Sequence, residues 1–300
     1  MIWLKRLAIL GGGPCVVLVL AVGGIYGFSA MALRKSYDIT ISPVLVRPDS
    51  ATVAHGRHIA VAITKCADCH GPDLGGEVMV DDPALGRIVA SDLTRGRGGI
   101  ADEYTDPDFV RAIRHGVRKD GMPIPAMPSR EYYSLNDADL GAPIAYLRSL
   151  PPVDRQLPET RLGLVGRGLV LFAGAHLLPA TGIDHDGPRP EAVAPGVTVE
   201  YGEYLAVTGG CVGCHGPGLS GGPIPGTPPD FPPATNIAPA GIGEWTEADF
   251  FRSLRQGIRP DGRVIDPAMP WANVGQMTDD EIRALWMYLR SAPRRETGGR

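Results

Sequence analysis

The sequence predicts an all-α protein in which one N-terminal transmembrane helix precedes two similar helical domains. Three observations predict this organisation. The chain opens with a run of 27 residues without a charge, from Leu7 to Leu33. Two copies of one pattern follow, at residues 51–150 and 197–292, and each reads as three helices joined by loops. Outside the N-terminal run we find no convincing alternation of apolar and polar residues of the kind typical of strands.

Residues 1–34 are predicted to form a membrane anchor, followed by a linker at residues 35–50. About 20 apolar residues suffice to cross a bilayer as a helix. Lys5 and Arg6 precede the uncharged run, which places that end in the cytoplasm by the positive-inside rule. We therefore expect a single-pass protein of the inner (cytoplasmic) membrane, with its domains in the periplasm or extracytoplasmic space. A signal peptide cleaved near Ser29–Ala32 is the alternative.

The composition limits the function. A length of 300 residues fits about two domains. The formal net charge is only -4, and the Lys and Arg residues are scattered. Without a basic stripe to neutralise phosphates, nucleic-acid binding is not expected. The 40 Gly and 29 Pro residues predict long loops between the helices.

The two repeats, residues 51–150 and 197–292, share motifs in the same order. Each has a first helix that leads into C-x-x-C-H, then a second and a third helix. Ser/Thr/Asn-x-x-acid patterns mark helix starts because their side chains accept hydrogen bonds from free amide groups. These signals are Thr105 with Asp108, Thr246 with Asp249, Asn136, and Thr278 with Glu281.

Residues 151–196 are predicted to link the repeats, and residues 293–300 form a tail. The apolar stretch Leu162–Leu178 is expected to form a short helix or a strap on a domain surface. It is too short for a second membrane span and contains Arg167.

Two C-x-x-C-H motifs carry the chemistry. This pattern is typical of covalent haem c attachment, because two thiols three positions apart can each form a thioether and the adjacent His then binds the iron. A redox dithiol or a zinc site is the alternative. The motifs comprise Cys66, Cys69 and His70 in the first repeat, and Cys211, Cys214 and His215 in the second. Cys15, in the apolar run, is interpreted as a small buried hydrophobe.

A methionine at the same place in each repeat is the expected second axial ligand. Met127 and Met269 both occur in Ala-Met-Pro, in the loop between the second and third helices. A thioether is a soft ligand, and Met/His ligation raises the haem potential. Met122 is a nearby alternative to Met127, but the second repeat has Arg263 at that point.

Two further aromatic residues match between the repeats. Tyr104 and Trp245 precede the second helix and are expected to pack at a haem edge or to bind a propionate. The remaining histidines have no histidine partner in the other repeat and are interpreted as surface or packing residues. These are His55, His58, His115, His176 and His185.

With these motifs, the chain resembles a tandem of class I cytochrome c domains. The resemblance covers about two thirds of the chain and implies two haem c groups, with a first helix crossing a last helix. It also implies that a small residue on the first helix touches an aromatic residue on the last, which here would be Gly56 with Tyr146 and Gly202 with Tyr288. The layout is similar to cytochrome c subunits of periplasmic dehydrogenases, which usually hold three haems, and of terminal oxidases.

Six-coordinate iron leaves no vacancy for a substrate, so we expect an electron-transfer protein and not an enzyme. The expected partners are redox proteins: a dehydrogenase or respiratory complex as donor, and a cytochrome or terminal oxidase as acceptor. A haem enzyme with one open iron site, such as a dihaem peroxidase or a thiosulfate-oxidising cytochrome, is the alternative. A haem-based sensor would need a signalling domain, which the few residues before Leu7 cannot supply.

Overall fold

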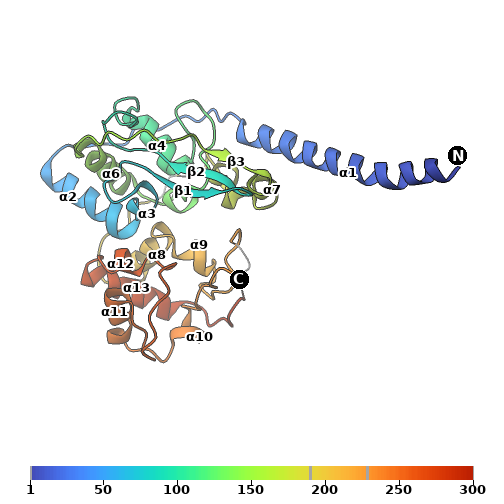
Figure 1. Ribbon diagram of the computed structural model, residues 1–300. Coiled ribbons are helices and arrows are strands. Elements are labelled where there is room, and N and C mark those ends of the chain that lie inside the picture. Colours follow the sequence, from blue (N-terminus) through green and yellow to red (C-terminus); the bar gives the residue numbers. More distant parts are fainter. Residues whose placement is uncertain (1, 189–190, 228–229, 300) are drawn as a thin grey trace.

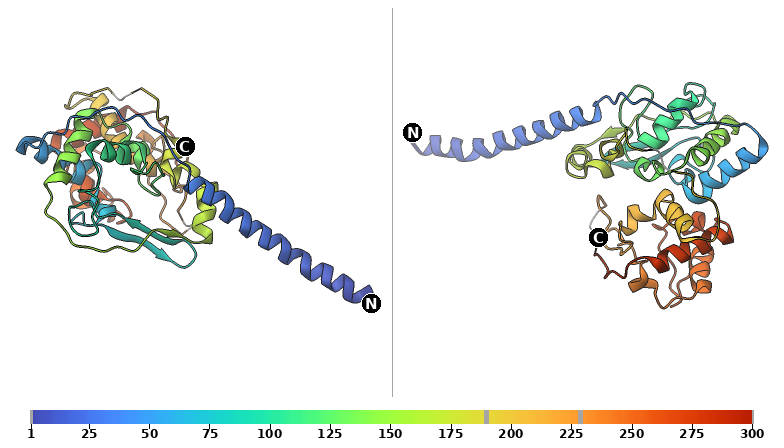
Figure 2. Two further views of the ribbon diagram at one scale, coloured as in Figure 1. Left: turned by 90° about the horizontal axis from the view of Figure 1, so that it is seen from above. Right: turned by 180° about the vertical axis from the view of Figure 1, so that it is seen from behind.

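A computed structural model describes residues 2–188, 191–227 and 230–299. The N-terminal run forms one helix, α1 (Ile2–Leu33), which extends from the rest of the protein as a rod (Figures 1 and 2). Its part from Pro14 to Leu33 is 20 residues long, has a mean hydropathy of 2.2 and is only 6% buried. By length and composition α1 can cross a membrane, a property that N-terminal signal sequences share.

The first repeat folds into short helices around a β-hairpin (Figure 1). Its elements are α2 (Ser50–His58), a π-helical turn η1 (Ile59–Ile63), α3 (Ala67–His70), β1 (Glu77–Asp82), β2 (Gly86–Ala90), α4 (Asp106–His115), α5 (Ser129–Tyr132) and α6 (Asp137–Ser149).

The second repeat has the same order of helices, with one additional short helix, α10, and no counterpart of the strands β1 and β2 among its described residues. Its helices are α8 (Val199–Thr208), α9 (Cys211–His215), α10 (Pro239–Ile242), α11 (Glu247–Gln256), α12 (Trp271–Val274) and α13 (Asp279–Ser291). The segment between the repeats holds β3 (Arg161–Leu162), α7 (Leu164–Phe172) and the 3-10 turns η2 (Gly174–His176) and η3 (Pro179–Gly182). α7 confirms the short helix expected within Leu162–Leu178.

The predicted helix starts are confirmed. α4 and α11 each begin with a reciprocal capping box, in which the N-cap threonine and the aspartate three residues later bind each other's backbone N–H groups. Thr278 and Glu281 do the same for α13. Asn136 caps α6 by accepting a hydrogen bond from the N–H of Asp139. Local sequence therefore determines where these helices start.

The first and last helices of each repeat cross at a glycine. An added Cβ on Gly56 would overlap the carbonyl oxygen of Ala142, and one on Gly202 would overlap that of Ala284. Gly202 also lies against the Cβ of Tyr288, whereas the closest atoms to Gly56 belong to the backbone of α6. Both crossings therefore require glycine, because the backbone of the last helix lies closest to it.

The expectation of an all-α fold was incomplete, because β1 and β2 of the first repeat form a small antiparallel sheet with β3 of the connecting segment, in the order β1-β2-β3. Asp82 forms the hairpin turn by accepting hydrogen bonds from the backbone N–H groups of Ala84 and Leu85, at 2.8 and 2.7 Å. The strand residues are mostly half-buried or exposed. Such strands need no long apolar alternation, which is the signal on which the sequence prediction relied.

The π-helical turn η1 accommodates one extra residue in the first repeat. Ten positions separate Gly56 from Cys66, whereas nine separate Gly202 from Cys211. The N–H of Thr64 reaches back five residues to the carbonyl of Ile59, at 2.8 Å. Both repeats therefore keep the glycine crossing and the C-x-x-C-H motif in equivalent places.

Candidate functional site

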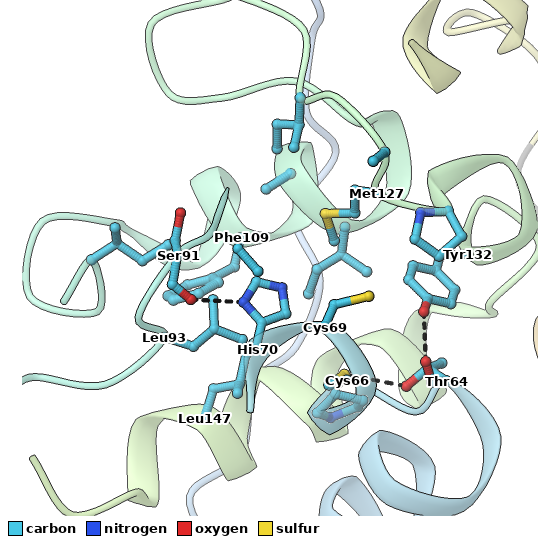
Figure 3. A pocket seen from close by; sticks show the side chains of 18 of the residues that line it. Thr64, Cys66, Cys69, His70, Ser91, Leu93, Phe109, Met127, Tyr132 and Leu147 are labelled. Carbon is cyan, nitrogen blue, oxygen red and sulfur yellow. Dashed lines mark hydrogen bonds between the residues drawn. The ribbon is translucent and has the colours of Figure 1, made fainter. Parts of the chain in front are cut away.

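A cavity in the first repeat brings together the residues that the sequence singled out. Cys66, Cys69 and His70 line it together with Met127 (Figure 3). The other walls are largely apolar and come from β2, α4, α6 and the loops that connect them. They include Ile88, Leu93, Ile100, Phe109, Leu135 and Leu147. The cavity thus offers two thiols, an imidazole and a thioether within an apolar enclosure.

Neither pair of motif cysteines forms a disulfide in this structure. Burial raises the pKa of the Cys66 and Cys211 thiols, and burial together with Asp68 raises the pKa of Cys69. A redox dithiol requires a lowered thiol pKa, so this environment does not suit that chemistry. In the described ranges 2–188, 191–227 and 230–299, no group of three or more His, Cys, Asp or Glu side chains is arranged to hold a metal ion. The two cysteine pairs therefore do not meet in a zinc site.

Each motif histidine is oriented by a backbone carbonyl. The Nδ1 of His70 lies 2.7 Å from the carbonyl oxygen of Ser91, and the Nδ1 of His215 lies 2.6 Å from that of Thr235. Nδ1 therefore donates, which makes Nε2 the nitrogen with the lone pair, as an iron ligand requires. Burial lowers the pKa of His70, which also favours the neutral imidazole.

The turn after each histidine is the same in both repeats. Leu74 and Leu219 are buried and adopt the same left-handed conformation, with φ of 57°. The carbonyl of His70 accepts a hydrogen bond from the N–H of Gly76, and that of His215 accepts one from Gly221, at 2.8 and 2.9 Å. Two left-handed leucines at equivalent positions indicate that the motif geometry is imposed twice by the same local fold.

The methionine loops also repeat in detail. Each starts with a small hairpin and ends in a one-turn helix, α5 or α12. The carbonyl of Met127 accepts from the N–H of Ser129 at 2.8 Å, and that of Met269 from the N–H of Trp271 at 2.7 Å. Both methionines pack half-buried against the core. Met127 lines the first-repeat cavity, whereas Met122 lies in the turn outside its lining.

Tyr104 lies at the cavity of the first repeat, and Trp245 occupies the matching position in the second. Tyr104 is buried and lines the cavity, and burial raises its pKa. Trp245 is half-buried against the core of the second repeat. Both precede a capped second helix, as the sequence pattern predicted.

The two repeats are joined by a pair of equivalent hydrogen bonds. Tyr204 on α8 donates to Asp139 on α6, with 2.6 Å between Oη and Oδ2. His58 on α2 lies 2.9 Å from Glu281 on α13. His58 and Tyr204 both lie two residues after the crossing glycine, and both acids lie three residues after an N-cap. Each first helix therefore contacts the start of the other repeat's last helix.

A second contact within each repeat completes this network. His55 lies 2.8 Å from Asp139, and Tyr201 lies 3.5 Å from Glu281. Although burial opposes it, the hydrogen bonds from His55 and Tyr204 hold the pKa of Asp139 below its usual value. The hydrogen bond to Asp139 in turn raises the pKa of His55. The interpretation of His55 and His58 as surface or packing residues did not include this role. The available signal was that tyrosines, Tyr201 and Tyr204, occupy the matching positions of the second repeat.

The two C-x-x-C motifs lie on either side of the same boundary. Lys65, directly before Cys66, donates to the carbonyl of Ile63 at 2.7 Å and to that of Gly209, in the second repeat, at 2.6 Å. Asn273 on α12 donates to Asp68, inside the first motif. Burial lowers the pKa of Lys65, and Cys211 and Asp68 oppose this effect. One ammonium group therefore lies between the two motifs.

A comparison with family models matches this architecture. The model described as Cytochrome c matches residues 53–151 and 199–293, so that each match contains one C-x-x-C-H motif and one Ala-Met-Pro loop.

Curated relatives point in the same direction. The chain is 27% identical to the fructose dehydrogenase cytochrome subunit of Gluconobacter japonicus over 298 residues, which are 90% of this chain and 59% of that protein. It is 39% identical to the cytochrome c subunit of alcohol dehydrogenase (quinone) of Gluconobacter oxydans, over 30% of this chain and 20% of that subunit. A diheme cytochrome c-type protein of Cereibacter sphaeroides is 28% identical over 76% of this chain and 82% of its own length. The chain thus spans 59% and 20% of the lengths of the first two relatives.

Proposed function

The chain belongs to the cytochrome c family, and from this premise we propose that it relays single electrons through two covalently attached haem c groups at the outer face of a membrane. One observation carries the proposal: Cys66, Cys69, His70 and Met127 line a single apolar cavity. A dihaem relative, of which this chain covers 82%, supports two haems per chain.

In this proposal the residues have equivalent roles in the two repeats. Cys66 and Cys69 form thioethers to one haem, and Cys211 and Cys214 to the other. His70 and Met127 bind the first iron, and His215 and Met269 the second. Tyr104 and Trp245 pack at the haem edges. When bound, each haem supplies an iron that gains and loses one electron.

Electron transfer is favoured over catalysis by the ligand set. An iron bound by both the imidazole and the thioether would have no open position for a substrate. The apolar walls exclude water, and the fixed Nδ1 hydrogen bonds of His70 and His215 hold both rings in either oxidation state. We therefore propose that the chain is not itself an enzyme.

The packing of the repeats supports transfer within the chain. Lys65 and Asn273 bridge the boundary at the first motif, and both motifs adjoin that boundary. In this proposal, electrons pass between the two sites across this packed boundary, and no movement of one repeat relative to the other is needed. We propose residues 51–150 and 197–292 as the two haem domains, joined by residues 151–196, with residues 293–300 as a tail.

We further propose that residues 1–34 are an uncleaved anchor in the inner membrane, followed by a linker at residues 35–50, with the haem domains in the periplasm. The packing of α1 supports retention, because Ser29 is fully buried and accepts a hydrogen bond from Arg167 at 3.1 Å. The mature chain would lose this contact if the helix were removed. The relatives support a dehydrogenase as donor, and the acceptor would be a cytochrome or a terminal oxidase.

Haem content per chain tests the proposal. The full-length protein, made in a host that attaches haem c, should carry two haems by alkaline pyridine absorbance and by intact mass. Cys66→Ser with Cys69→Ser should leave one, and so should Cys211→Ser with Cys214→Ser. Cys15→Ser is the matched control and should leave two. A wild-type chain without covalent haem would overturn the proposal, and a high-spin signal would favour an enzyme with an open iron site.

A further inference from the structure

The helix α7 (Leu164–Phe172) exposes an apolar face that the haem sites do not explain. Phe172 is 86% exposed, Val165 49% and Leu164 40%, whereas Gly166 and Val170 are buried. At 3.6 residues per turn, the three exposed side chains lie within an arc of about 100°. Surface helices normally carry polar residues on the outward face, and exposed apolar patches mark interaction sites. We therefore expect another molecule to cover this face.

α7 is fixed to the first repeat on its other side. The N–H groups of Gly163 and Val165 donate to the carbonyls of Leu85 and Ala84, in the hairpin turn, at 2.9 and 3.1 Å. An added Cβ on Gly166 would overlap the carbonyl of Leu85. The exposed face is therefore held rigidly relative to the haem-bearing fold.

α7 also packs along the C-terminal part of α1 (Figures 1 and 2). Arg167, its single charged residue, donates to Ser29 and stacks over the ring of Tyr26, with 4.7 Å from the guanidinium carbon to the ring centre. The guanidinium group of Arg167 therefore contacts α1, and the exposed apolar face of α7 carries no charge.

The position along α1 indicates the depth of α7. The uncharged run from Leu7 to Leu33 is longer than the about 20 residues that cross the hydrocarbon region, so its last residues reach the outer interface. Tyr26 and Ser29, which contact Arg167, lie in the last quarter of α1, on the outer side of the bilayer. Tyr26 and Phe28 are 44% and 65% exposed there, as expected for aromatic residues at a membrane interface.

We propose that α7 is an interfacial membrane helix, which inserts Leu164, Val165 and Phe172 among the lipid acyl chains of the outer leaflet. The occupant is lipid because α7 packs directly against the anchor that crosses the same leaflet. With α1 and α7 both in contact with the bilayer, the haem domains keep one orientation to the membrane instead of swinging on a single tether. The proposal rests on the membrane anchor proposed above.

Accessibility of a spin label at position 172 tests this. In a Cys15→Ala background, Phe172→Cys and the control Val264→Cys each receive one nitroxide in the full-length, haem-loaded and reduced protein in lipid nanodiscs. Val264 is 73% exposed and lies on the second repeat. Power saturation then compares collisions with oxygen, which enriches in lipid, and with a water-soluble nickel chelate.

We expect the ratio of oxygen to nickel accessibility to be at least several-fold higher at position 172 than at 264. Equal ratios would overturn the proposal, because they would place Phe172 in water. Exclusion of both reagents would also overturn it, because a protein surface would then cover α7. Failure of the anchor itself is seen separately as loss of the protein from the nanodisc fraction, and failure of haem binding as loss of the visible spectrum.

A second variant gives an independent readout. Phe172→Ser with Val165→Ser should widen the range of haem orientations and so lower the amplitude of haem linear dichroism in oriented membranes. The absorbance spectrum should stay unchanged. The substitutions lie on the exposed face, so the fold is retained. Unchanged dichroism would show that α7 does not orient the domains.

Discussion

Tyr204 of the second repeat donates a hydrogen bond of 2.6 Å to Asp139 of the first. Asp139 also binds His55 and the N-cap residue Asn136, so that one carboxylate joins the two repeats and the start of α6. Its counterpart Glu281 binds His58 and the N–H of Thr278 in the same way. Paired acids at helix starts therefore form the joint between the two candidate electron-transfer sites.

Tyr204→Phe should destabilise the joint between the repeats. The substitution keeps the buried ring and removes only the hydroxyl, which leaves Asp139 with fewer donors. Because hydrogen bonds to charged groups are the stronger ones, we expect a loss of about 1.5–3 kcal/mol in the free energy of unfolding. Urea unfolding of the full-length protein in detergent measures it. Tyr201→Phe is the matched control, because its 3.5 Å contact lies within one repeat, and it should cost less. Equal costs would contradict the assigned role.

The His55–Asp139 pair should make stability depend on pH. The pKa of His55 is raised from 6.5, so its contribution is complete below 6.5 and is lost as the pH rises through the raised value. The pKa of Asp139 is lowered from 3.8, so its contribution is complete above 3.8 and is lost as the pH falls through the lowered value.

The difference in unfolding free energy between wild type and His55→Gln should therefore be greatest between pH 3.8 and 6.5. His55 is half-exposed, so the effect should stay below about 1 kcal/mol. Urea titrations inside this window and well above it supply the comparison. A difference that grows with rising pH would have the wrong sign.

Lys65→Met should lower the reduction potentials of both haems. A half-buried positive charge between the motifs disfavours the oxidised, more positive iron, so its removal should stabilise that state. We expect shifts on the order of tens of millivolts. Spectroelectrochemical titration of the full-length protein measures them. Lys35→Met, in the segment after α1, is the control and should shift neither potential. Upward shifts, or a response of one haem alone, would contradict the position assigned to Lys65.

The glycine crossings should tolerate no side chain. Gly56→Ala or Gly202→Ala would drive a methyl group into the backbone of the last helix, at a cost of about 1–3 kcal/mol. Gly168→Ala on α7 meets no atom within 4 Å and should be neutral or slightly stabilising, because alanine favours helices. Thermal unfolding of the three variants compares them. A stable Gly202→Ala protein would show that the crossing is not close.

Much of the helical framework was predictable, because its signals are local. Thr105 with Asp108 and Thr246 with Asp249 cap helices through contacts three residues apart, which the sequence displays directly. The internal repeat favoured Met127 over Met122 as the ligand, because only Met127 has a methionine at the matching position of the second repeat. Repetition within one chain thus served as a second observation of each position.

What the sequence did not reveal depends on long-range contacts. The β-hairpin pairs with β3 in the segment after the first repeat and supplies Ser91, whose carbonyl orients His70. His58 meets Glu281 only when the repeats pack, so no local pattern marks it. The contact of Arg167 with Ser29 likewise joins two segments that read separately as an anchor and a linker helix.

The charge-transfer absorbance between methionine sulfur and oxidised iron tests the central claim most directly. If His70 with Met127 and His215 with Met269 hold the two irons, the oxidised wild-type protein should show this band at a two-haem intensity. Met127→Ala and Met269→Ala should each remove one haem's share, while Met122→Ala leaves the band intact. A band absent from the wild type, or unchanged in both loop variants, would contradict the claim.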